Sequence, residues 1–234
     1  MKALYSLILS IVFIGFIGCN KNNTSSNTAS TSIINKVNGT PIQLGKSYWL
    51  KNNDSIIIER LDYYISNITI TNGQNSKSNN TLFLINSENN KISINYSNET
   101  NPISSLNMTA SLTTEQNNSN PTSFSASNPL SSSKNMYWSD WTKYRYVVFE
   151  GRILSGGQSK TFTFHTGLSY ATNISINGNK TLSENNTIDL NIDKIFYPVS
   201  GNNINDSELI THSEVSQDAI TKKFIQNFGS AFSF

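Results

Sequence analysis

Short runs of alternating apolar and polar residues recur along this chain, and turn residues separate them. Alternation with a period of two is typical of β-strands that bury one face. The clearest example is Thr187–Phe196, in which every second residue from Ile188 to Ile192 is aliphatic. The pattern predicts strands at Ser55–Glu59, Leu61–Ile65, Ile68–Ile70, Thr81–Ile85, Lys91–Tyr96, Tyr144–Phe149, Lys160–His165, Thr172–Ile176 and Thr187–Phe196.

Two segments depart from this pattern. Ser216–Phe228 is expected to form a helix, because Ile220, Phe224 and Phe228 roughly share one helical face. Asn101–Leu130 has only two short apolar islands among Ser, Thr and Asn, so we expect a long loop there. Many short strands without helix-sized spacers predict an all-β fold, a β-sandwich of two Ig-like sheets with a short C-terminal helix.

The first twenty residues have the pattern of a bacterial export signal. Lys2 precedes an uncharged, mostly apolar run that reaches Gly18 and is too short for a comfortable membrane-spanning helix. The run ends in the letters FIGC, which resemble a lipobox, and its Cys19 is the only cysteine. The resemblance implies a signal peptide at residues 1–18, cleavage before Cys19 and acylation of its thiol. The alternative is an ordinary signal peptide with an incidental cysteine.

A lipid anchor on Cys19 would attach the protein to a membrane. Asn20 follows the cysteine where Asp would signal the inner membrane, so we expect an outer-membrane lipoprotein, facing either the periplasm or the cell surface. Residues 19–31 carry almost no apolar side chains and are expected to form a flexible tether. The β-sandwich domain is then expected at residues 32–234.

Composition narrows the possible classes of function. The chain is 36% hydrophobic and 14% charged, with 35 asparagines and a net charge of +2. Twelve Phe, ten Tyr and three Trp provide enough bulk for a core, which argues against a disordered chain. The small net charge argues against a nucleic-acid-binding surface. With Cys19 acylated, the domain has no thiol for a disulfide or a thiolate metal site.

Enzyme signatures are absent from the sequence, which contains no G-x-G-x-x-G, Walker, HExxH or G-x-S-x-G motif. A hydrolase would have to use His165 or His212, the only two histidines. We therefore expect a protein that is not an enzyme. Of three hypotheses for its function, a hydrolase is the weakest.

Three separated segments carry a resemblance to a known family. The first, Leu61–Asn67, contains the letters YYISN. The second combines MYWSDW at residues 136–141 with the aromatic strand YRYVVFEG at 144–151. The third is FTFHTG at residues 162–167. In this order and at these distances, the segments resemble the MbnP-like copper-binding family over roughly residues 33–234.

The resemblance implies a β-sandwich that binds one copper ion outside the cytoplasm. Its better-known members oxidise a tryptophan to kynurenine with a di-haem MauG-like peroxidase as partner. Carried over, Trp138 is the modified residue, His165 an imidazole ligand and His212 a second candidate ligand. In strand geometry Asp140 points to the same side as Trp138 and is a further candidate ligand. Without gaps, Asp140 stands where the family has its second Trp, and Lys143 where it has Gly.

Two functional hypotheses lead at this point. Copper without cysteine must use nitrogen, oxygen or thioether donors, which the histidines and Met136 can supply. The first hypothesis is therefore a copper-binding lipoprotein that sequesters or delivers the ion. The second is a metal-free β-sandwich that presents exposed Tyr and Trp side chains to a glycan or protein partner. His165 is expected on the strand face opposite Phe162 and Phe164, and Glu150 is expected to anchor a turn.

Overall fold

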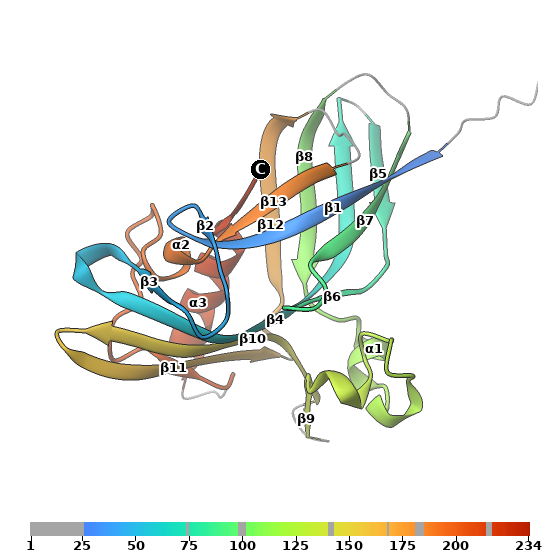
Figure 1. The fold of residues 1–234 in the computed structure, drawn as a ribbon. Helices are drawn as coiled ribbons and strands as arrows, with labels where there is room; N and C mark the ends of the chain where they lie inside the picture. The colour runs from blue at the N-terminus through green and yellow to red at the C-terminus, as the bar shows by residue number, and fades with distance from the viewer. Residues whose placement is uncertain are drawn as a thin grey trace, which may run out of the picture.

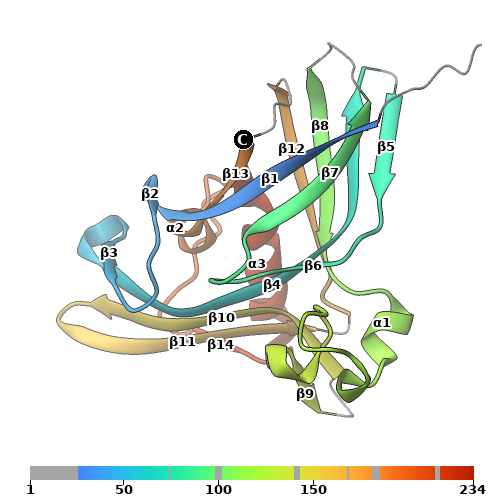
Figure 2. The same cartoon turned by 45° about the vertical axis from the view of Figure 1, so that its right-hand side comes forward.

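The computed structural model describes residues 26–73, 75–97, 102–139, 143–167, 169–180, 185–213 and 217–234. Over these ranges the chain folds into two β-sheets that face each other, with α2 (Ile192–Phe196) and α3 (Asp218–Ser230) toward one side and α1 (Thr114–Asn118) toward the other (Figures 1 and 2). The two-sheet β-sandwich predicted from the alternation is confirmed. Signal peptide and Cys19 lie outside the described residues, so lipidation stays a prediction.

The strands divide into two groups by hydrogen bonding within the described ranges. The five-stranded sheet contains β1 (Ser26–Val37), β2 (Thr40–Pro41), β7 (Lys91–Ser97), β13 (Asn185–Asn191) and β15 (Phe232–Ser233). The ten-stranded sheet contains β3 (Ser47–Trp49), β4 (Ser55–Asn72), β5 (Asn75–Asn79), β6 (Phe83–Ile85), β8 (Ile103–Ala110), β9 (Tyr137–Ser139), β10 (Lys143–Ser155), β11 (Gln158–Gly167), β12 (Thr172–Lys180) and β14 (Ile210–Thr211).

The helical segments are short, with one exception. They are α1 (Thr114–Asn118), α2 (Ile192–Phe196), α3 (Asp218–Ser230) and the 3-10 turns η1 (Lys51–Asn53), η2 (Pro121–Ser123) and η3 (Ser132–Lys134). Helix α3 confirms the C-terminal helix, and its buried Phe224 and Phe228 lie on the predicted face. None of the helices in the described ranges is long and apolar enough to span a membrane.

Four sequence-based boundaries need correction. The three runs between Ser55 and Ile70 are one continuous strand, β4. The run Thr187–Phe196 is strand only to Asn191 and then turns into α2. The expected tether overlaps β1, which starts at Ser26 and pairs with both β7 and β13. The expected loop from Asn101 contains β8, which lies between β12 and β4 in the sheet.

Strand β8 escaped prediction because its inward residues are separated by small polar ones. Its buried positions include Ile103, Leu106, Met108 and Ala110, and Ser, Asn or Thr occupies most positions between them. The alternation is present, but the polar residues resemble the Ser/Thr/Asn loops on either side. Pairing with two neighbouring strands, a non-local interaction, therefore sets the strand state here.

Aromatic rings fill the space between the sheets and α3. Phe164 of β11 stacks on Phe224 of α3 with ring centroids 4.5 Å apart, and Phe149 of β10 lies 4.8 Å from Phe162. Tyr63 packs edge-on against Phe228 at 5.4 Å. Phe162 and Phe164 belong to this inner core, so His165 lies on the opposite, outer face, as the sequence predicts.

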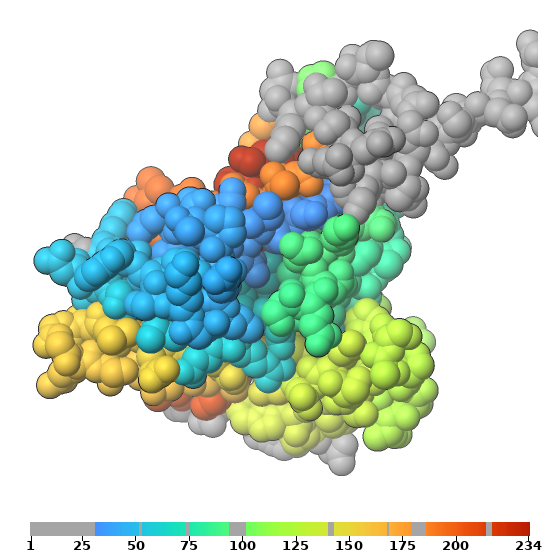
Figure 3. All heavy atoms as spheres, in the orientation of Figure 1, coloured from blue at the N-terminus to red at the C-terminus, as the bar shows by residue number. Residues whose placement is uncertain are grey.

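The outer face of β4 and β10 carries a second, smaller core, which is covered by residues 111–139. Its buried members are Tyr64, Leu84, Leu112, Leu130, Met136, Tyr144, Tyr146 and Val148. The Tyr64 hydroxyl donates to the Pro129 carbonyl at 3.1 Å, and the Tyr144 hydroxyl donates to the Leu130 carbonyl at 2.8 Å. Figure 3 shows this covering segment as a yellow-green bulge beside the sheets. We call residues 111–139 the covering lobe.

We predict that Gly151→Ala destabilises the fold by about 1–3 kcal/mol, the usual cost of overpacking a core. An added Cβ would lie 2.1 Å from the Ile57 carbonyl oxygen and 2.7 Å from Cζ of Phe162. Urea unfolding of the variant beside Ser155→Ala, on the same strand, measures the effect. An unchanged midpoint for Gly151→Ala would contradict this account of the close packing.

Candidate metal centre

Parallel pairing of β11 and β14 brings the two histidines together. Phe164 pairs with Thr211, so the next residues along the two strands, His165 and His212, are lateral neighbours. Neighbours in adjacent strands share a face, and the Nδ1 atoms of the two imidazoles lie 3.2 Å apart. His165 is buried, with an exposed fraction of 6%. His212 is partly buried.

The turn after β14 holds His212 in this position. Its backbone N–H donates to Oε1 of Gln217 at 2.7 Å, and the Ser213 hydroxyl donates to the His165 carbonyl oxygen at 2.9 Å. Ser213 has a φ of +62°, in the left-handed region that a tight turn requires. The hydroxyl groups of Thr211 and Thr221 also contact each other and join β14 to α3. His212 is thus placed by the turn and by α3.

Glu150 orients the His165 ring from the neighbouring strand. Its Oε1 lies 2.6 Å from Nε2 of His165. The hydrogen bond with His165 lowers the pKa of Glu150, so the carboxylate is ionised and can only accept. His165 must therefore donate from Nε2, which leaves the Nδ1 lone pair directed at His212. Carboxylates placed this way fix the tautomer of metal-binding histidines.

The expectation that Glu150 anchors a turn is wrong. This residue lies inside β10 and pairs across the sheet with Thr163 of β11. The signal that could have found it is Gly156-Gly157, a two-residue hairpin whose glycines both have positive φ. Counting back from that turn places Glu150 and His165 on one face.

Burial lowers the pKa of His165, against the upward effect of the Glu150 hydrogen bond. The imidazole is then neutral at pH 7, the form that binds metal ions.

The indole ring of Trp138, in β9, contacts both imidazoles, and the three rings form an aromatic triad. The indole centroid lies 5.5 Å from that of His165 and 5.2 Å from that of His212, both edge-on. The indole is 45% exposed, so it closes the site while reaching solvent. Lys143, at the start of β10, has a φ of +59°. A backbone of that shape favours glycine, so the lysine adopts it at a cost in strain.

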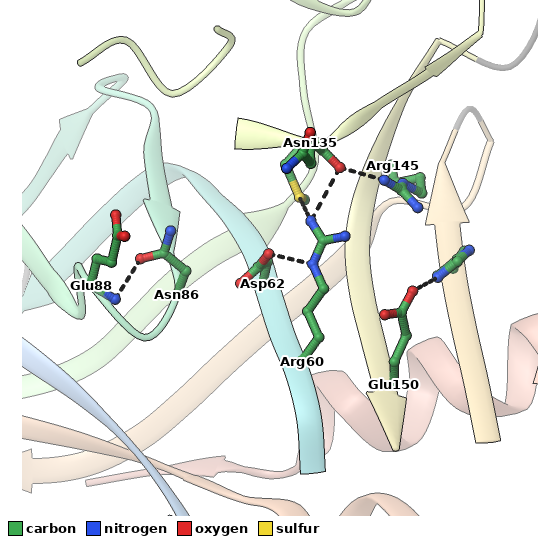
Figure 4. A network of polar contacts seen from close by, with 9 residues as sticks. Arg60, Asp62, Asn86, Glu88, Asn135, Arg145 and Glu150 are labelled. Atoms are coloured by element: carbon green, nitrogen blue, oxygen red, sulfur yellow. Dashed lines mark hydrogen bonds and ion pairs between the residues drawn. The ribbon is translucent and has the colours of Figure 1, made fainter. Parts of the chain in front are cut away.

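An arginine pair anchors the covering lobe beside the triad, a feature that sequence analysis missed. Nη2 of Arg60 and Nη2 of Arg145 both donate to the carbonyl oxygen of Asn135, and Figure 4 shows the two guanidinium groups converging on it. Arg60 also pairs with Asp62 at 2.6 Å. Met136 is fully buried, and its sulfur lies 3.7 Å from Nη2 of Arg60. Its thioether is therefore packed in the outer core.

The histidine pair matches the spacing that one metal ion imposes. Two imidazole nitrogens bound at 2.0–2.1 Å to a tetrahedral ion lie about 3.3 Å apart. Among the residues the structure describes, no group of three or more His, Cys, Asp or Glu side chains could hold a metal. The two histidines therefore have no third ligand of these four residue types within the described ranges. Asp140 lies outside them, so its predicted ligand role stays a prediction.

The comparisons with known proteins agree with this architecture. The sequence model of the MbnP family matches residues 26–214. The chain belongs to the MbnP family. The solved structure of MbnP from Methylosinus trichosporium has a similar fold, with a TM-score of 0.54 and 11% sequence identity, and the match covers 73% of this chain and 78% of that one. A search of curated proteins finds no significant match. The MbnP resemblance carried by the three segments is thus confirmed.

We predict that Glu150→Gln lowers the pKa of His165 further below its ordinary value. The charged partner that favours the imidazolium is lost, while the burial that disfavours it remains. NMR titration of the two histidine ring signals measures this, with Glu59→Gln as the control because Glu59 pairs with Arg152 instead. A His165 pKa that stays unchanged or rises would contradict the assigned role of Glu150.

Proposed function

We propose that this MbnP-family protein is an extracytoplasmic copper-binding lipoprotein, not an enzyme, and that it sequesters or delivers a single copper ion. His165 and His212 hold the ion through their Nδ1 atoms. The observation that carries the proposal is the 3.2 Å separation of these atoms, with Glu150 holding one ring in the required tautomer. The family's association with copper supports the same assignment.

The donor set suits copper better than harder ions. Imidazole nitrogen binds both oxidation states of copper, whereas Mg²⁺ and Ca²⁺ prefer clusters of oxygen ligands. The Glu150 carboxylate is already engaged with Nε2 of His165, so it acts on the ion only through the ring. When bound, copper would be a soft cation that the site holds reversibly. The chain's residues bind it, orient the rings and close one side with the indole.

We further propose that Trp138 is oxidised to kynurenine and supplies a third donor, its new aromatic amine. Oxidation of the indole adds two oxygen atoms to give N-formylkynurenine, and hydrolysis with one water then releases the formyl carbon as formate, so kynurenine has one oxygen more and one carbon less than tryptophan. The oxidation needs an external oxidising partner, for which a di-haem MauG-like peroxidase is the candidate. Two features support this choice of residue: Trp138 is 45% exposed to a partner, and its ring contacts both histidines.

A second candidate function is a metal-free interaction module. Trp49 is 71% exposed, and Leu154 is 37% exposed. Both pair with Ser55, from β3 on one side and β10 on the other, so they lie in one row on the same sheet face. This row could present apolar surface to a glycan or protein partner whether or not the histidines bind copper.

We predict about one copper ion per chain in wild-type protein and loss of that copper in His165→Ala and His212→Ala. Glu150→Gln is expected to weaken copper affinity by roughly 10- to 100-fold, as for other residues that orient a metal ligand. Metal analysis and competition with a copper chelator measure both effects. Thr163→Ala is the matched control, since Thr163 lies on the same face of β11, two residues from His165.

Wild-type protein without copper would overturn the copper proposal and favour the interaction module. Copper that persists in both histidine variants would place the ion elsewhere. In either case Trp49→Ala and Leu154→Ser should then be compared with wild type for binding to cell-envelope glycans.

We predict two covalent changes in protein isolated from its native host. The Trp138 peptide should carry the mass change of kynurenine, and the N-terminal peptide should begin at an acylated Cys19. Mass spectrometry of both peptides measures this, with Trp49 as the internal control for non-specific oxidation. An intact Trp138 in copper-loaded protein would remove kynurenine from the proposed ligand set, and an unmodified Cys19 would exclude the lipid anchor.

A further inference from the structure

Arg145 carries a positive charge beside the histidine pair and forms no direct ion pair with a carboxylate in the described ranges. Its guanidinium carbon lies 5.6 Å from the centre of the Trp138 ring, the same ring that contacts both histidines. Nη2 of Arg145 donates to the Asn135 carbonyl, and Nε is buried without a hydrogen-bond partner. Arg145 makes no salt bridge within these ranges, unlike Arg60, which pairs with Asp62.

Two carboxylates lie near the site. Asp62 pairs with Arg60, and the Glu150 carboxylate accepts the hydrogen bond of the neutral His165 ring and keeps its own negative charge. Burial and the neighbouring Arg60 lower the pKa of Arg145, whereas the Glu150 and Asp62 carboxylates act in the opposite direction. An arginine nevertheless stays protonated in proteins. The charge of Arg145 therefore acts directly on any cation that the imidazoles bind.

We infer that Arg145 biases the histidine site toward Cu(I) over Cu(II). The inference rests on the proposed copper function and adds a residue that selects the charge of the ion. Two neutral imidazoles bring no negative charge, so a divalent ion meets twice the repulsion from the guanidinium that a monovalent ion meets. The guanidinium and both imidazoles contact the Trp138 ring, so a bound ion lies about two side-chain contacts from Arg145. At that separation in a partly buried site, one extra unit of charge on the ion changes its binding constant on the order of tenfold.

The test is the Cu(II)/Cu(I) reduction potential of the copper-loaded full-length protein. Arg145→Gln should bind Cu(II) about tenfold more tightly relative to Cu(I), which lowers the potential by about 59 mV for a one-electron couple. Arg145→Met is the second neutral variant if the glutamine variant does not fold. Arg145→Lys keeps the charge and should keep the potential. Arg152→Gln is the matched control, because Arg152 lies on the same strand in an exposed ion pair with Glu59.

The possible outcomes separate this inference from the proposed function. Wild-type protein that binds neither copper ion overturns the proposed function and the inference with it. Neutral variants that bind copper with an unchanged potential overturn the inference alone. A potential that falls as far in Arg145→Lys as in Arg145→Gln does the same, since it assigns the effect to the shape of the guanidinium and not to its charge. A fall in the neutral variants alone supports it.

Discussion

The alternation of side chains along β11 is the constraint on which the site depends. Phe164 points inward to stack on Phe224 of α3, and the next residue, His165, points outward toward Glu150. Burial of the Phe164 side chain therefore fixes the direction of the His165 side chain. A sheet that buried only its inner face would leave His165 in water, where an imidazole has no fixed orientation. The outer core supplied by the covering lobe makes the polar side of β10 and β11 a defined site.

The covering lobe packs on the outer core and is also held by hydrogen bonds to its backbone carbonyls. Tyr64 and Tyr144 hold the carbonyls of Pro129 and Leu130, and two arginines share the carbonyl of Asn135. Asn135 has a φ of +53°, and this left-handed turn directs the chain into β9. Trp138 follows three residues later, so the position of the indole depends on the same contacts. This arrangement gives the two arginines a structural role that is compatible with an electrostatic one.

The histidine pair joins segments that are far apart in the chain. His165 lies near the end of a hairpin strand whose register is set locally, whereas His212 directly follows a two-residue strand that contacts α3. A metal ion between them would tie the C-terminal part of the fold to the central sheet. Binding free energy at such a site adds to folding free energy, because the unfolded chain has no preformed site.

Several features could be derived from the sequence alone: the all-β class, the strands around β4, β7, β10 and β11, the helix α3 and the outward direction of His165. These follow from residues adjacent in the chain, since alternation and helical spacing are local properties. The MbnP resemblance also supplied Trp138, His165 and His212 as candidate site residues. Tertiary structure alone decided that β8 is a central strand, that β1 starts at Ser26 and that Arg145 lies over Trp138. It also decided that His212 meets His165, because the pairing of β14 with β11 joins distant segments that no local pattern encodes.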